Sequence, residues 1–67
     1  MPIDGDRVVR FRVRLGWMRK DLASASGVSY SQIAQIERGD SGGSERSAKA
    51  IADALGLTVD DIWRYDT

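Results

Sequence analysis

Glycine interrupts this chain of 67 residues at intervals that suit short helices. Gly16, Gly27, Gly39 and Gly56 each follow a segment in which apolar residues recur three or four positions apart. A glycine just beyond such a segment is the usual C-terminal stop of an amphipathic helix. The single proline is at position 2, and no segment alternates β-branched and polar residues as a strand does. The sequence therefore predicts an all-α fold.

We expect five helices, at about residues 6–15, 19–26, 30–38, 44–55 and 59–64. Asp4 or Asp6 can cap the first helix, and Ser44 can cap the fourth. Thr58 with Asp61 makes an acidic variant of the capping box before the fifth helix. The residues expected to face the core are Val8, Phe11, Leu15, Trp17, Leu22, Ala25, Ile33, Ile36, Ala48, Ile51, Ala52 and Leu55. The loop at 40–43 is too short to separate domains, so residues 1–67 are expected to form one domain.

The composition excludes several classes of function. The chain has neither cysteine nor histidine, which removes disulfides and the usual zinc ligands. No paired carboxylates in an apolar pocket, glycine-rich phosphate loop or metal-ligand cluster can be recognised, so we expect no enzyme, no metal and no cofactor. No apolar run approaches a membrane span, and nothing resembles a signal peptide, so a cytoplasmic protein without a membrane partner is expected.

Charge is balanced overall but unevenly distributed. Ten basic and ten acidic residues give a net charge of zero, which does not favour a nucleic-acid partner. Residues 1–22, however, carry six positive and three negative charges, whereas the remainder carries four positive and seven negative ones. This distribution fits either two solvated surfaces or a basic face for a polyanion.

The segment from Leu22 to Ile36 predicts a helix-turn-helix. Two short helices are joined at Gly27, and the small Ala23 lets them approach closely. A helical pair with a glycine turn is common and is weak evidence by itself. The stronger evidence for a DNA-binding motif is the outward face of the second helix of the pair. Ser31, Gln35 and Arg38 can donate hydrogen bonds there, glutamine can bind adenine through two hydrogen bonds, and Ala34 is small enough to contact a thymine methyl group. This face is typical of a helix that binds DNA bases.

Two charged residues occupy inward positions on their helices. At about 100° per residue, Glu37 lies beside Ile33 on the core side of the third helix. Arg12 lies between Val8 and Leu15 on the core side of the first. A buried carboxylate alone is costly, whereas a hydrogen-bonded arginine–glutamate pair roughly balances its desolvation and fixes how two helices pack. We expect a structural Arg12–Glu37 ion pair; the alternative is that one side chain extends to solvent.

The segments LGWMRKDLASASGVSYSQIAQIERG and IADALGLTVDDI resemble the phage repressor and Cro-type (Xre) helix-turn-helix domains. The resemblance extends over about residues 6–63 and implies a five-helix repressor-like DNA-binding domain whose second and third helices form the motif. It also implies that positions 30–38 form the recognition helix, and this family pairs the positions of Arg12 and Glu37. The residues at positions that contact bases in this family are Tyr30, Ser31, Gln32 and Gln35. Those at positions that contact phosphates are Arg19, Lys20 and Arg38.

The chain departs from the family pattern at four places. Met18 stands where a serine, threonine or asparagine cap is usual, so the second helix is expected to begin loosely. Glu45 and Lys49 replace frequent leucines of the fourth helix, and Gly43 replaces the customary proline before it. The differences at Gly43, Glu45 and Lys49 concern the packing between the third and fourth helices.

Two further surfaces are candidates for partners. Arg7, Arg10 and Arg14 share one face of the first helix and could flank phosphates or simply be solvated. Val9 and Val13 lie beside the core stripe, and apolar residues near the C-terminus exceed what so small a core needs. Val9 and Val13 are candidates to face a partner, and the residues of the possible dimer interface are Ile62, Trp63 and Tyr65.

Two functions follow from these observations. The preferred one is a sequence-specific transcriptional regulator, a repressor, that binds double-stranded palindromic DNA as a homodimer. The alternative is a helical protein-interaction module of the antitoxin or adaptor type, which the neutral net charge favours. The outward face of the third helix, with arginines at either side, favours DNA binding.

Overall fold

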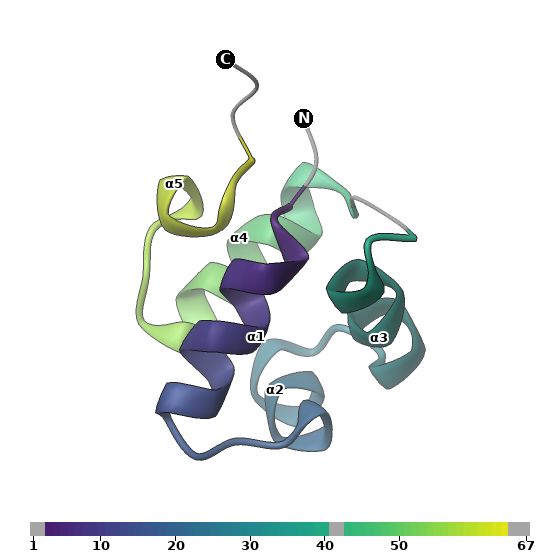
Figure 1. Cartoon of the computed structure of the whole chain (residues 1–67), viewed down its shortest axis with the longest axis vertical. Coiled ribbons are helices and arrows are strands. Elements are labelled where there is room, and N and C mark those ends of the chain that lie inside the picture. Colours follow the sequence, from purple (N-terminus) through teal and green to yellow (C-terminus); the bar gives the residue numbers. More distant parts are fainter. Residues whose placement is uncertain (1–2, 41–42, 65–67) are drawn as a thin grey trace.

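Five helices account for most of the computed structural model, which describes residues 3–40 and 43–64. They are α1 (Gly5–Arg14), α2 (Arg19–Ser26), α3 (Tyr30–Arg38), α4 (Glu45–Leu55) and α5 (Val59–Ile62), shown in Figure 1. Among the described residues the only extended pairing is an isolated bridge between Ile3 and Trp63. None of the described helices has the length and apolarity that crossing a membrane requires. The expected all-α fold with five helices is confirmed.

The helix ends follow from capping residues visible in the sequence. Asp4, rather than Asp6, caps α1, because its Oδ1 accepts a hydrogen bond from the backbone N–H of Asp6 at 3.1 Å. Gly27 and Gly39 end α2 and α3 with φ of 77° and 82°, a conformation that suits glycine. α5 stops at Ile62, two residues earlier than expected, because the next residue is extended.

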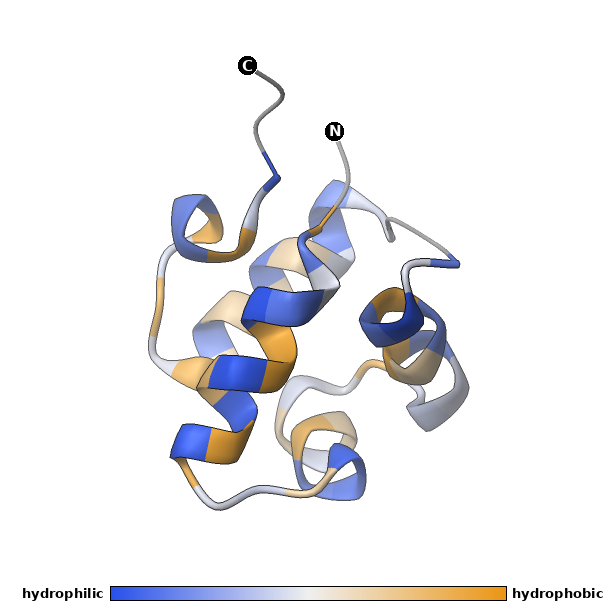
Figure 2. Ribbon diagram, in the orientation of Figure 1, coloured by the Kyte–Doolittle hydropathy of each residue, from blue (hydrophilic) through white to orange (hydrophobic). Residues whose placement is uncertain are grey.

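One hydrophobic core joins all five helices. Its largest fully buried side chains are Val8, Leu22, Ile33, Ile36, Ile51 and Ile62. Figure 2 shows that apolar and polar residues alternate along the helices. α4 packs against α2 and α5, while α1 packs against α3 and α5. The α2–α3 pair is thereby held on a rigid base, with one side of α3 left open.

Two residues expected in the core lie elsewhere. Leu15 is 50% exposed, because α1 ends at Arg14 and the chain turns away before the next turn of helix is complete. Ala25 is exposed, because the inward side of α2 is formed by Leu22 with Ala23 and Ser26 beside it. Both errors arise on short helices, where a small rotation changes which positions face inward.

Gly5 fixes the approach of α1 to α3. This residue is buried at the start of α1, and a Cβ atom placed on it would overlap the carbonyl oxygen of Ile36. The two helices therefore meet through backbone at this point. That contact places Arg12, further along α1, near the end of α3.

Candidate nucleic-acid interface

The turn between α2 and α3 is built from three consecutive residues. Gly27 adopts the left-handed conformation, Val28 is buried, and Ser29 caps α3 by accepting a hydrogen bond from the backbone N–H of Gln32 at 3.1 Å. The buried Ile33 and Ile36 of α3 then join the core. α3 is thus anchored at its start and along one side, as a recognition helix must be.

The opposite side of α3 is open to solvent. Tyr30 is 54% exposed, and Ser31, Gln35 and Arg38 are also exposed. Among the described residues, the side chains of Ser31 and Gln35 form no hydrogen bond. Their donors and acceptors are therefore available to a ligand. A serine and a glutamine presented in this way can bind base edges in a major groove.

Two α3 residues expected to face DNA are less exposed than Ser31 and Gln35. Ala34 is only 6% exposed, so the expected contact with a thymine methyl group is wrong. The reason is that the inward sector of α3 is wide and takes in Ala34 together with its two isoleucines and Glu37. Gln32 is half-buried and donates a hydrogen bond from Nε2 to the hydroxyl of Ser47 on α4, at 3.0 Å. This bond directs the Gln32 amide toward the α4 side of the helix.

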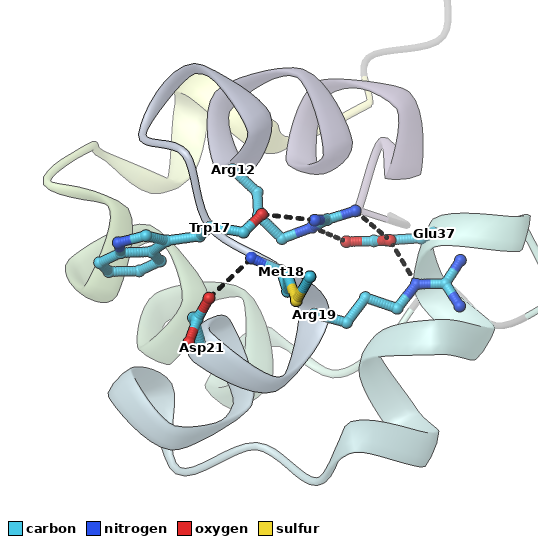
Figure 3. A network of polar contacts seen from close by, with 6 residues as sticks. All are labelled: Arg12, Trp17, Met18, Arg19, Asp21 and Glu37. Atoms are coloured by element: carbon cyan, nitrogen blue, oxygen red, sulfur yellow. Dashed lines mark hydrogen bonds and ion pairs between the residues drawn. The ribbon is translucent and has the colours of Figure 1, made fainter.

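Glu37 is the centre of a polar cluster that joins three helices (Figure 3). Its side chain is 1% exposed, and Oε2 accepts from Arg12 Nε at 2.8 Å. Oε1 accepts from Arg12 Nη2 at 3.1 Å and from Arg19 Nε at 2.8 Å. The structure thus contains the Arg12–Glu37 pair expected from the sequence, and it adds Arg19 as a third member. Three N–H groups donate to the buried carboxylate, which compensates for its removal from water.

Arg12 also fixes the turn that leads into α2. Its Nη1 donates to the carbonyl oxygen of Trp17 at 2.7 Å, and the half-buried indole packs against the core as expected. The next residue, Met18, forms no side-chain cap, yet its backbone N–H donates to Asp21 Oδ2 at 2.8 Å. Asp21 thus supplies one half of a capping box, while the side-chain acceptor for the first N–H groups of α2, absent as expected at Met18, is not replaced by another described residue.

The three candidate phosphate ligands differ in their surroundings. Arg19 is one-third exposed; its hydrogen bond to Glu37, and after it the influence of Tyr30, raises the pKa of its guanidinium above the usual value. Lys20 is exposed and has no ion pair among the described residues. Arg38 Nε donates to Asp40 Oδ2 at 2.9 Å, with both side chains more than half exposed. An exposed pair of this kind is weak enough to give way to a phosphate.

The arginine face of α1 is mostly engaged within the protein. Arg7 pairs with Asp4 at 3.6 Å and donates to the backbone carbonyl of Asp61 at 3.3 Å. The guanidinium of Arg14 lies 5.6 Å from the ring centroid of Phe11. Arg10 alone of the three has no such partner among the described residues. These contacts favour a solvated structural role for this face over a phosphate site.

The expected dimer interface requires correction at Ile62. This residue is fully buried in the core of a single chain and therefore cannot contact a partner. The apolar surplus inferred from sequence is smaller than expected, because the short α5 directs Ile62 inward. Trp63 is half-buried, Val9 is half-buried and Val13 is 58% exposed. Tyr65 lies outside the described residues.

Comparison with known proteins agrees with this geometry. The helix-turn-helix family HTH_3, of the Cro/C1 type, matches residues 9–62. The chain belongs to this family. Its fold is similar to that of the restriction-modification controller protein C.AhdI from Aeromonas hydrophila, with a TM-score of 0.82 and 28% sequence identity. The match covers 85% of this chain and 86% of that one. A search of curated protein sequences found no match.

Membership of this family makes the helix-turn-helix chain a DNA-binding transcriptional regulator. The contacts that sequence reasoning missed are those of Arg19 with Glu37, Gln32 with Ser47, and Met18 with Asp21. The last had a signal in the sequence, since an acidic residue three positions after a cap site is typical of a capping box. The first two join residues on different helices and had no such signal.

Proposed function

We propose that this regulator represses transcription by binding a palindromic operator as a homodimer. The observation that carries the proposal is the open side of α3, where the side chains of Ser31 and Gln35 are exposed and form no hydrogen bond within residues 3–40 and 43–64. Arg19 and Arg38 lie at the start of α2 and the end of α3, where they can bind the phosphates on either side of a groove. Tyr30 adds an exposed ring and hydroxyl at the start of α3.

We infer a dimer because the DNA-binding surface of a single chain is small. One module offers few base contacts, and specific operators are normally bound by two modules related by a two-fold axis, with recognition helices about 34 Å apart. Trp63 and Val13 are partly exposed apolar residues that a second copy could cover. The resemblance in fold to a restriction-modification controller protein supports a regulatory role. A DNA-binding role would place the protein in the cytoplasm, without a membrane partner.

A protein-interaction module of the antitoxin or adaptor type is the second candidate. The observation in its favour is the net charge of zero, because proteins that bind DNA tightly usually carry an excess of positive charge. Such a module would use the same fold to bind a protein partner and would not require an open polar face on α3. The two candidate functions therefore differ in whether the exposed side chain of Gln35 is needed to bind the partner.

A mobility-shift assay separates the two functions. The probe is the DNA upstream of the protein's own gene, and a random sequence of equal length serves as the control, each at two salt concentrations. We expect a discrete complex on the upstream DNA and weaker binding to the random sequence, with both weakened by salt. Failure of the protein to bind either DNA at low salt would favour the protein-interaction module.

A further inference from the structure

Glu37 has more hydrogen-bond donors than its pairing with Arg12 requires. Arg12 alone occupies both carboxylate oxygens, through Nε at 2.8 Å and Nη2 at 3.1 Å. Arg19 nevertheless adds a third contact, from its Nε to Oε1 at 2.8 Å. Because the Arg19 side chain is one-third exposed, solvent could satisfy it without Glu37. Besides binding Glu37, the third contact therefore restrains the Arg19 side chain.

The contact with Glu37 uses Nε of Arg19 and does not occupy its two terminal nitrogens. Nε binds the carboxylate, and in Figure 3 the two terminal nitrogens point away from it. A guanidinium held by one edge can still bind a phosphate through its terminal N–H groups. The cluster of Arg12, Arg19 and Glu37 keeps a net positive charge, with two cations against one anion. It therefore remains attractive to a phosphate.

The backbone that carries Arg19 is restrained by the same cluster. Arg12 Nη1 binds the carbonyl oxygen of Trp17, two residues before Arg19, at 2.7 Å. Asp21 then fixes the first turn of α2 through the N–H of Met18. Arg12 and Asp21 thus hold the start of α2, and Glu37 holds the side chain of Arg19.

We propose that Glu37 is a positioning residue for DNA binding, which holds Arg19 with its terminal nitrogens presented to a backbone phosphate. This inference rests on the DNA-binding function proposed above and assigns the buried ion pair a role beyond helix packing. An arginine side chain loses conformational freedom when it binds a phosphate, and a side chain already ordered in the free protein loses less. The buried Arg12–Glu37 pair would then affect how tightly Arg19, at the surface, binds a DNA phosphate.

A double-mutant cycle on DNA affinity tests this role. The four proteins are wild type, Glu37→Gln, Arg19→Ala and the double variant, titrated with upstream and random DNA at a temperature where circular dichroism shows each to be folded. We expect Glu37→Gln to weaken binding to both DNAs about tenfold when Arg19 is present, the cost of about one charge-assisted hydrogen bond. In the Arg19→Ala background, the same change should alter affinity less than about twofold, since no oriented side chain remains to be lost.

Lys20 provides the matched control. It neighbours Arg19, carries the same charge, and its side chain forms no ion pair with Glu37. In a Lys20→Ala background, Glu37→Gln should still weaken DNA binding about tenfold, because the positioned Arg19 is intact. A merely structural Glu37 would instead give the same loss in all three backgrounds, and that result would overturn the proposal.

Arg19→Lys keeps the proposal testable if the Glu37 variant fails to fold. Lysine preserves the charge but cannot bind a carboxylate by one edge and a phosphate by another. We expect its salt dependence to match wild type while its affinity falls about tenfold, as for Glu37→Gln; affinity equal to wild type would overturn the proposal. Wild-type protein that binds no DNA would overturn both this role and the proposed function, whereas DNA binding with zero coupling between positions 19 and 37 would overturn only this role.

Discussion

At the scale of single residues, Arg12 and Glu37 should respond unequally to mutation, because Arg19 shares the carboxylate. Glu37→Leu leaves the nearly buried Arg12 without its anion and should destabilise the protein by about 3–5 kcal/mol. Arg12→Leu should cost less, since Arg19 still binds Glu37. The double variant Arg12→Leu/Glu37→Leu should cost much less than the sum, because no unpaired charge then stays buried.

Thermal and urea melts of the two single variants and the double variant measure this pattern. Lys49 and Asp53 on α4 form an exposed pair at 3.9 Å and serve as the control, for which each single change should cost under about 1 kcal/mol. Additive losses at positions 12 and 37 would contradict the idea that the two residues stabilise the fold as a unit.

Alanine substitutions of Gln35 and Arg19 should weaken DNA binding in different ways. Gln35→Ala removes a free amide on the open side of α3 and should cost about 1–3 kcal/mol on the preferred operator, with little change on random DNA. Arg19→Ala should weaken both kinds of DNA and lower the salt slope by about one per protomer. Titrations at several salt concentrations measure both effects. The same loss of affinity for operator and random DNA in Gln35→Ala would exclude a base contact.

The sequence could place Glu37 and Arg12 opposite each other because helical periodicity assigns each an inward position. It could not place Arg19 beside them. Arg19 is the first residue of α2, and its direction depends on the turn at Trp17 and Met18, for which periodicity gives no information. The orientation of Ala34 was missed for a related reason, since the width of the buried sector of α3 depends on how closely α1 and α2 approach it.

At the scale of helices, Gly5 decides how α1 meets α3. Alanine normally stabilises a helix by up to about 1 kcal/mol relative to glycine, so propensity alone predicts a gain for Gly5→Ala. The added methyl group would instead overlap the Ile36 carbonyl oxygen and push the two helices apart. We therefore expect a loss of about 1–3 kcal/mol, as in other overpacked sites, measured by thermal melts. Ser24→Ala, on the exposed side of α2, is the control and should be neutral or stabilising.

The helix bounds were predictable where capping residues are explicit. α2 and α3 have the predicted bounds, because a left-handed glycine ends each of them and Ser29 begins the second. α1 and α5 differ at their ends. α1 begins at Gly5 because Asp4 is the cap, and α5 is shortened where Trp63 becomes extended and pairs with Ile3. That pairing joins the two ends of the described chain, a contact that local sequence does not reveal.

At the scale of the whole molecule, salt dependence reports how many copies bind the operator. The cations proposed to contact phosphate are Arg19, Lys20 and Arg38. Each phosphate neutralised contributes about 0.9 to the slope of log K against log salt, so one protomer should give a slope near −3 and a two-fold dimer about −5 to −6. The neutral net charge adds little beyond these local contacts. Sedimentation of the protein alone and on operator DNA supplies the stoichiometry independently, and we expect association at micromolar concentration or on DNA. A monomer in both conditions, with a slope near −3, would contradict the homodimer.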